Sequence, residues 1–291
     1  MNRPQQFSET ARLRKVIIGR WEGYRRVEAY VERVNMDQQN KLPTAAELQP
    51  EFEAFRAALE AEGVTVWQPD YVGKFVYDQL TPRDIAVTIG HQIVLCNMIK
   101  KSRRYEVAGI FPHLLSLEGE EPNILIPPRH DMLLEGGDIL IDKGYLFVGL
   151  SQRTNQAGFD YLEETFGHQF ELVPMHCKSL EEGENVLHLD CTFNPVGEQH
   201  ALIYPPGLRH IPEVIRERYE WIEVTAAEQA ALATNVLSVD EHTVISRTHP
   251  ACRRVNNLLR SIGLRVIEVP FDGAPSTGGS FRCCSLPLVR G

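Results

Sequence analysis

Residues 138–149 read DILIDKGYLFVG, and this stretch decides how the rest of the chain is interpreted. Two short apolar runs, 138–142 and 145–149, flank a Lys-Gly pair that suits the turn of a tight β-hairpin. A helical pattern follows over about residues 156–166, and another apolar run follows at 170–174. The stretch therefore predicts a unit made of two hairpin strands, a helix and a further strand.

The same ββαβ unit recurs along the chain. In its last copy, residues 235–239 and 243–246 flank a Glu-His turn, a helix spans about 250–262, Gly263 caps that helix, and 264–269 form a strand. Three other copies are less complete. The first has a strand at 15–18, a helix after Pro50 and a strand at 64–68, and the second has strands at 85–89 and 92–95 with a helix from about residue 103. The fourth has strands at 191–195 and 201–204. A period of about 50 residues is typical of a repeat protein. We expect five α/β units around an axis, as a single domain over residues 1–291; an α/β sandwich with coincidental spacing is the alternative.

The composition of this 291-residue chain excludes several classes of protein. Its net charge is −9 and it has no long basic run, so nucleic acid is not expected as a partner. No stretch approaches the ~18 consecutive apolar residues of a membrane span. The N-terminal residues are polar and broken by Pro4, which does not fit a secretory signal. We therefore expect a cytoplasmic protein; whether it forms a homo-oligomer is left open.

The cysteine and glycine patterns do not indicate a metal site or a cofactor site. The chain has six cysteines but no C-x-x-C pair, so neither a structural zinc site nor, in the cytoplasm, a disulfide is expected. It also has no phosphate-binding glycine loop and no dinucleotide fingerprint. We therefore predict that the protein needs no metal and no organic cofactor.

Polar side chains stand where the first strands of three units begin. Asp84, the Glu135-Gly-Gly-Asp138 stretch and the His188-Leu-Asp190 stretch all precede apolar strands. Buried carboxylates are costly unless a cation or a hydrogen-bond donor pairs with them. Each group alone is more often a polar turn or a cap. In register with a repeat around an axis, however, they would ring one small site.

The stretch GGSFRCCSLP at 278–287 supplies a candidate nucleophile. Paired glycines allow the backbone to approach closely, and the adjacent thiols of Cys283 and Cys284 suit a reactive site. A cysteine near a terminus is more often structural. A thiol beside an imidazole, in contrast, is readily activated for nucleophilic attack.

Together, these motifs resemble the guanidine-modifying superfamily of penteins, which includes arginine deiminases, dimethylarginine dimethylaminohydrolases and glycine amidinotransferases. The resemblance runs from about residue 81 to 290, and TPRD (81–84), EGGD (135–138), HLD (188–190) and RCCSLP (282–287) occur in the family's order. It implies a pseudo-symmetric five-bladed α/β propeller with its active site at the centre.

The resemblance also implies roles for individual residues. Cys283 matches the nucleophile, His188 the general acid and base, and Glu135 the carboxylate beside that histidine. Asp84 and Asp190 match the residues that hold the guanidinium nitrogens. The remaining substrate-binding residues are expected to be Asp138, Arg103 and Arg153; the two arginines match those that grip the substrate carboxylate. A bound guanidinium favours the thiolate nearby, and attack by Cys283 then gives a covalent amidino intermediate.

The segments differ in the reaction class that they resemble. HLDCTFNP (188–195) and PRDI (82–85) are most like the amidinotransferases, whereas VGLSQRTNQ (148–156) and Cys283-Cys284-Ser285 are most like the dimethylarginine hydrolases. Glu135, where those amidinotransferases carry Asp, and Arg153 favour hydrolysis. We expect a hydrolase of arginine or a methylated arginine, with an amidinotransferase as the alternative. A non-catalytic protein that binds guanidino compounds is disfavoured, because both Cys283 and His188 are present.

Overall fold

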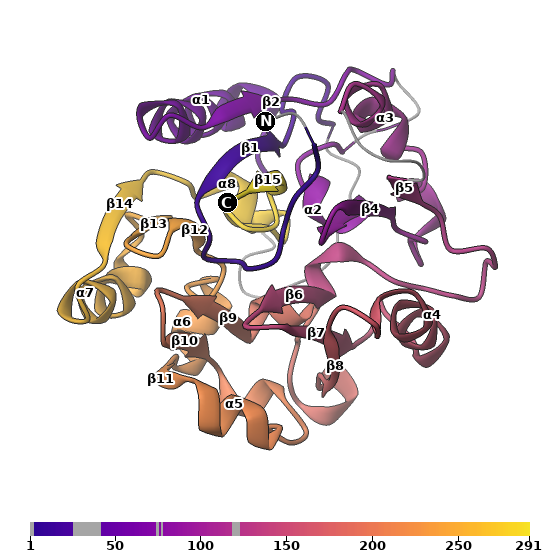
Figure 1. The fold of residues 1–291 in the computed structure, drawn as a ribbon. Coiled ribbons are helices and arrows are strands. Elements are labelled where there is room, and N and C mark those ends of the chain that lie inside the picture. The colour runs from indigo at the N-terminus through magenta and orange to yellow at the C-terminus, as the bar shows by residue number, and fades with distance from the viewer. Residues whose placement is uncertain (1–2, 26–41, 74–75, 77, 118–122) are drawn as a thin grey trace.

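The computed structural model describes residues 3–25, 42–73, 76, 78–117 and 123–291. The strands among these residues form five three-stranded sheets, which surround a common axis (Figure 1). In every sheet the middle strand runs antiparallel to one neighbour and parallel to the other. A helix precedes the parallel strand in each unit. This arrangement confirms the five-bladed α/β propeller predicted from the sequence.

The hairpin at residues 138–149 folds as its sequence predicts. Strands β6 (Ile139–Asp142) and β7 (Tyr145–Leu150) pair antiparallel across a two-residue turn. In that turn Lys143 has φ 51° and Gly144 has φ 81°, the left-handed conformation that a tight hairpin turn requires at both positions. The helix α4 (Gln156–Phe166) and the parallel strand β8 (Glu171–His176) complete the blade.

Three other blades repeat this order. Their strands and main helices are β3 (Ala86–Ile89), β4 (Gln92–Leu95), α3 (Val107–Leu115) and β5 (Ile124–Leu125); β9 (Phe193–Val196), β10 (His200–Ile203), α5 (Glu213–Arg218) and β11 (Glu220–Glu223); and β12 (Leu237–Asp240), β13 (Thr243–Arg247), α7 (Arg253–Ser261) and β14 (Arg265–Val269). The sequence did not indicate α5 or β11. It also placed the start of α3 about four residues early, because residues 101–103 form a separate 3-10 turn.

The first blade joins the two ends of the described chain. Strand β1 (Leu13–Ile18) lies between β2 (Thr65–Trp67), which runs parallel to it, and β15 (Ser285–Arg290), which runs antiparallel. The ring is thus closed by the last strand. The sequence analysis had not placed β15 in this blade.

The helix α1 (Ala45–Ala61) corrects the prediction that this helix begins after Pro50. A capping box of Thr44 and Glu47 starts it six residues earlier, at Ala45, and Pro50 is accommodated inside it. Its buried residues form the apolar stripe Leu48, Phe52, Phe55 and Leu59. Full burial of each such side chain contributes about 1.5–3 kcal/mol, which fixes the helix against its sheet.

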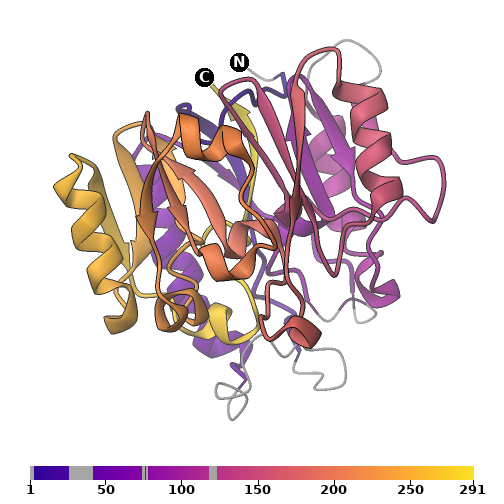
Figure 2. The same ribbon diagram turned by 90° about the horizontal axis from the view of Figure 1, so that it is seen from below.

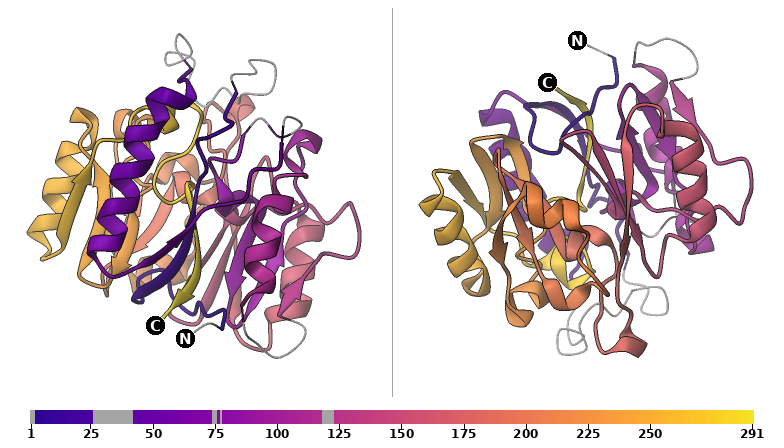
Figure 3. Two further views of the ribbon diagram at one scale, coloured as in Figure 1. Left: turned by 90° about the horizontal axis from the view of Figure 1, so that it is seen from above. Right: turned by 60° about the horizontal axis from the view of Figure 1, so that its bottom comes forward.

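The helices α1, α3, α4, α5 and α7 lie outside the ring of sheets (Figure 1). The two described chain ends lie at one end of the axis of this ring, away from the short helix α8 (Gly273–Ser276) (Figures 2 and 3). The N-terminal segment crosses that end of the ring: Gln6 pairs with Gly90, and the Glu9 N–H donates to Ile141 O. No helix in the described ranges is long and apolar enough to cross a membrane.

A buried ion-pair cluster fills the axis beneath this segment. Glu9 Oε2 lies 2.7 Å from Arg282 Nη1, and Glu9 Oε1 lies 3.8 Å from Arg83 Nη1. All three side chains are at most 2% exposed. Burial raises the pKa of Glu9, but Arg282 and Arg83 outweigh it and lower the pKa to about 2. The cluster therefore links the N-terminal segment to the residues that precede Cys283 and Asp84.

We predict that Glu9→Gln destabilises the protein by about 3 kcal/mol or more at pH 7, because it removes the carboxylate that Arg83 and Arg282 share and leaves Arg282 with Asp190 alone. Urea denaturation measures this loss. The matched control is Glu268→Gln, which breaks a solvent-exposed pair with Arg260 and should cost less than about 1 kcal/mol. Because the pKa of Glu9 is lowered, its contribution is present above its usual value of 4.5 and is lost as the pH falls towards 2. Equal effects of the two substitutions at pH 7 would contradict the proposed importance of the cluster.

Candidate active site

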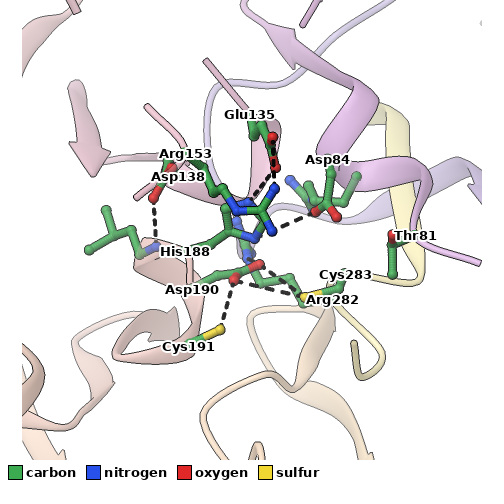
Figure 4. Close-up of polar contacts among 12 residues, drawn as sticks. Thr81, Asp84, Glu135, Asp138, Arg153, His188, Asp190, Cys191, Arg282 and Cys283 are labelled. Atoms are coloured by element: carbon green, nitrogen blue, oxygen red, sulfur yellow. Dashed lines mark hydrogen bonds and ion pairs between the residues drawn. The ribbon is translucent and has the colours of Figure 1, made fainter. Parts of the chain in front are cut away.

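Short segments that lead into the first strands of the blades meet at the axis. They are α2 (Pro82–Ile85), the 3-10 turns Gly136–Asp138 and Leu189–Cys191, and the loop after α8 that carries Cys283. The acidic and imidazole residues predicted from the sequence are all buried there. In Figure 4 Asp84, Glu135, His188 and Asp190 surround one place, while the Asp138 carboxylate points towards the turn that carries His188. The structure thus brings the predicted set together at one place.

His188 lies between carboxylates from two other blades. Its Nε2 is 2.9 Å from Glu135 Oε2, and its Nδ1 is 3.8 Å from Asp84 Oδ1. Burial alone lowers the pKa of His188, but Asp84, Glu135 and Asp138 outweigh it and raise the pKa to about 9. The imidazole is therefore a cation at neutral pH, poised to donate a proton.

The glycines of the EGGD motif make room for this imidazole. A Cβ built on Gly137 would lie 2.7 Å from His188 Nδ1, and one on Gly136 would lie 2.1 Å from the Arg83 carbonyl oxygen. Both contacts are shorter than real Cβ atoms make, so any side chain at these positions would push the blades apart. The motif is thus a close-packing signal as well as a source of carboxylates.

The sulfur of Cys283 lies beside the carboxylate of Asp190, 3.7 Å from Oδ2 and 3.9 Å from Oδ1. Burial and then the charge of Asp190 raise the pKa of the Cys283 thiol well above its usual value. The ligand-free site therefore holds a neutral thiol. The backbone N–H of Cys283 donates to Asn235 Oδ1 at 3.1 Å. The sequence analysis did not identify Asn235 as a residue of the site. Cys284, in contrast, packs into the hydrophobic core with Phe281.

Asp138 makes its contacts with the protein itself. Its carboxylate accepts hydrogen bonds from the hydroxyls of Ser151 and Thr154, both at 2.7 Å, and from the Leu189 N–H at 2.9 Å. Burial raises the pKa of Asp138 to about 7. One side chain thus joins the loop after β7 to the turn that carries His188.

Arg103 reaches the site from the turn before α3. Its Nη1 lies 2.7 Å from Asp84 Oδ2, while its Nε lies 2.8 Å from Glu106 Oε1 and its Nη2 donates to Thr81. Glu106 is buried, and burial raises its pKa to about 8 although Arg103 works against this. The sequence analysis missed Glu106. Its spacing of three residues from Arg103 was visible, but its burial was not.

Arg153 lies in the loop between β7 and α4, and its side chain is 4% exposed. Its Nη1 is 3.3 Å from Glu135 Oε1, so Glu135 contacts His188 with one oxygen and Arg153 with the other. In Figure 4 the Arg153 guanidinium points into the group formed by Glu135, His188 and Asp84. Burial lowers the pKa of Arg153 to about 10, and the side chain remains a cation.

Ligand atoms of Asp84, Glu135 and His188 lie within 4.8 Å of one another, close enough to share a divalent metal ion. Two features of the site oppose this use. A metal would have to displace the proton of His188, whose pKa is near 9. It would also meet Arg103 and Arg153, which already neutralise the two carboxylates. The proton on His188 and the two arginines therefore oppose a metal ion at this place.

Comparison with known proteins identifies the family. A family model described as "N,N dimethylarginine dimethylhydrolase, eukaryotic" matches residues 28–290. The uncharacterised protein YkgA of Bacillus subtilis is 37% identical over 215 residues, which cover 74% of this chain and 71% of that protein. The arginine deiminase of Listeria welshimeri is 27% identical over 248 residues and 72% of this chain, but this chain spans 60% of that relative's length.

Solved structures share the fold. The amidinotransferase SxtG, from the saxitoxin pathway of Microseira wollei, gives a TM-score of 0.82 at 19% identity over 99% of this chain and 97% of that one. The N-terminal domain of a cyanobacterial arginine dihydrolase, ArgZ, gives 0.79 at 20% identity over 95% and 97%. From its five blades, its central buried site and the extent of the family match, this chain belongs to the pentein superfamily of enzymes that act on guanidino groups, in the family described as N,N-dimethylarginine dimethylhydrolase.

Proposed function

We propose that the chain hydrolyses the guanidino group of arginine or an arginine derivative, with Cys283 as the nucleophile. The observation that carries this proposal is the Cys283 sulfur, 3.7 Å from Asp190 at the centre of a buried group of carboxylates. Such a group selects a cation, and a thiol inside it is placed to attack the carbon of a planar guanidinium.

Binding and activation are coupled in this proposal. Asp84 and Asp190 hold the guanidinium nitrogens and localise their charge, which makes the central carbon a better electrophile. The cation also offsets the charge of Asp190, one of the groups that raise the pKa of the Cys283 thiol. The thiol therefore releases its proton to solvent when the substrate arrives and not before, and the protonated ureido product returns a proton to the thiolate at the end of the cycle.

His188 then moves the remaining protons. The thiolate attacks the guanidinium carbon, and the tetrahedral adduct expels an amine that takes its proton from His188. This step leaves a covalent amidino group on the sulfur and a neutral imidazole. The imidazole next accepts a proton from water as that water attacks the same carbon. The C–S bond then breaks, and Cys283 leaves as the thiolate while a ureido product is released.

Two buried networks position the groups that react. Asp138 ties the loop of Arg153 to the turn of His188, so we assign it a positioning role in place of the substrate contact expected from the sequence. Glu106 holds Arg103 from the side opposite Asp84. Arg103 therefore orients Asp84. A substrate carboxylate that binds Arg103 would have to share this arginine with Asp84 and Glu106.

Hydrolysis is favoured over amidino transfer by Glu135. The side chain of Glu135 reaches both His188 and Arg153. The amidinotransferases that the chain resembles carry an aspartate at this position, whose side chain is one methylene shorter. The second candidate is an amidinotransferase that moves the amidino group from arginine to an amine. The stretch HLDCTFNP at 188–195, which is most like the amidinotransferases, supports it.

Cys283→Ala should lower turnover of arginine by more than about a thousandfold, because it removes the attacking atom. Cys284→Ala removes the same atoms from the adjacent residue, whose sulfur packs in the core, and should keep most of the activity. Product formation with purified variants measures both effects. An inactive Cys284 variant beside an active Cys283 variant would mean that the other sulfur is the nucleophile.

Mass spectrometry of the products tests the reaction class directly. With arginine as the sole organic substrate, we expect citrulline, because water completes the reaction; dimethylarginine, tested in parallel, gives the same product if methylated arginine is the substrate. Adding glycine should leave the product unchanged. Guanidinoacetate and ornithine that form in the presence of glycine would instead establish the amidinotransferase.

The imidazole of His188 should titrate near pH 9 in the ligand-free protein, which NMR of the histidine side chains measures. Glu135→Gln should lower this pKa, because it removes one of the negative charges that favour the imidazolium. Since the folded-state pKa is raised, this pairing stabilises the fold below the usual value of 6.5 and is lost as the pH rises through about 9. A pKa that is the same in the Glu135→Gln variant would show that Glu135 does not set the charge of His188.

A further inference from the structure

The blade of β12, β13 and β14 also sends a polar side chain to the axis, at the same register as residues of the site. Asp84 lies two residues before β3 and Cys283 two residues before β15, and Asn235 likewise lies two residues before β12. Asn235 is buried, as is Thr234 beside it. Because equivalent positions of the blades meet at the axis, Asn235 is the contribution of this blade to the site.

The side-chain amide of Asn235 joins two backbone segments that carry groups of the site. Its Oδ1 accepts from the Cys283 N–H at 3.1 Å, and its Nδ2 donates to the Asp190 backbone oxygen at 3.5 Å. The Asn235 backbone oxygen also accepts from the Arg282 N–H at 3.3 Å. An amide suits this place because it offers an acceptor and a donor on one short, uncharged side chain.

The segment that carries Asn235 is itself fixed to the neighbouring blade. The Thr234 hydroxyl donates to the Cys191 backbone oxygen at 2.9 Å. Asn194 Nδ2 donates to the Thr234 oxygen at 2.8 Å and to the Val236 oxygen at 2.9 Å. Asn235 is therefore a rigid point from which the position of another residue can be set.

The two groups that the amide joins depend on it to different degrees. The Asp190 carboxylate is also held by Arg282, whose Nε lies 3.4 Å from Oδ2. The Cys283 carbonyl accepts from the Arg83 N–H at 3.3 Å, a longer bond than the one from the Cys283 N–H to Asn235. Loss of the amide therefore releases the backbone of Cys283 more than the carboxylate that lies beside its sulfur (Figure 4).

We infer that Asn235 is a positioning residue that holds the Cys283 sulfur beside the Asp190 carboxylate. Its effect on turnover rests on the proposed function, whereas its effect on the place of the sulfur is visible without turnover. With the amide present, the sulfur stays where a guanidinium bound by Asp190 will lie. Without it, the sulfur samples positions farther from this carboxylate, and fewer of them allow attack.

Alkylation of the ligand-free protein by iodoacetamide at pH 8 tests the placement, and mass spectrometry of the Cys283 peptide measures the rate. Burial and then the charge of Asp190 raise the pKa of this thiol, and a sulfur that leaves Asp190 loses the second effect. Cys283 should therefore react about tenfold faster in Asn235→Ala. The control is Asn256→Ala, which removes two buried hydrogen bonds from α7 of the same blade and should stay within about twofold of the parent rate. A rate in Asn235→Ala no higher than in the control would overturn the inference.

Kinetics and binding then separate positioning from substrate contact. Asn235→Ala should lower kcat for arginine by about 10- to 100-fold, because a displaced nucleophile is costly to the reaction. On a Cys283→Ala background the same substitution should change the arginine affinity by less than about threefold, because Arg282 still holds the Asp190 carboxylate. An affinity loss as large as the loss of kcat would overturn the inference. A parent protein that forms no product from arginine or dimethylarginine, with or without glycine, would overturn the proposed function, while the alkylation rates would still decide the role of Asn235.

Two further variants keep the test decisive. If thermal melting shows that Asn235→Ala is unfolded, Asn235→Ser replaces it; its hydroxyl is too short to reach both partners, so faster alkylation and slower turnover are again expected. Asn235→Asp keeps the acceptor for the Cys283 N–H and should not speed alkylation. Alkylation that is as fast in Asn235→Asp as in Asn235→Ala would contradict a role for this hydrogen bond.

Discussion

Buried charge that must be neutralised is the constraint on which the rest of this structure depends. At the axis Glu9 pairs with Arg282, whose Nε lies 3.4 Å from Asp190, and Asp190 in turn lies beside the Cys283 sulfur. An unbroken series of charged contacts thus runs from the segment that crosses the ring to the atom proposed to react. In a low-dielectric interior none of these groups is stable alone, so each fixes the position of the next.

The same constraint shapes the part of the site that faces the substrate. Asp84 is matched by Arg103 and Glu135 by Arg153, so these two pairs balance and the protonated His188 adds one positive charge to them. A substrate cation disturbs this balance, and the thiol of Cys283 is the group able to restore it by releasing a proton. Binding energy and nucleophile activation therefore have one electrostatic origin, which explains why a neutral thiol is compatible with the proposed chemistry.

Local signals in the sequence predicted the parts of this architecture that depend on neighbouring residues. The Lys143-Gly144 turn, the helix at 156–166 and the grouping of Asp84, Glu135 and His188 were all visible as patterns. The start of α1 was placed wrongly because a proline outweighed the capping box before it. The pairing of β15 with β1, the burial of Glu106 and the contact of Asn235 with Cys283 join residues distant in space or sequence, for which a single sequence carries no periodic signal.

The pairing of β1 with β15 has a consequence for how the protein acquires reactivity. This contact joins the most distant strands of the chain, so it belongs to the slow, high-contact-order part of folding. Cys283 lies two residues before the start of β15, in the loop after α8, and its backbone N–H donates to Asn235 from the neighbouring blade. A partly folded chain with an open ring thus has carboxylates but no correctly placed thiol. The arrangement proposed for Cys283 is therefore complete only when β15 pairs with β1 and closes the ring.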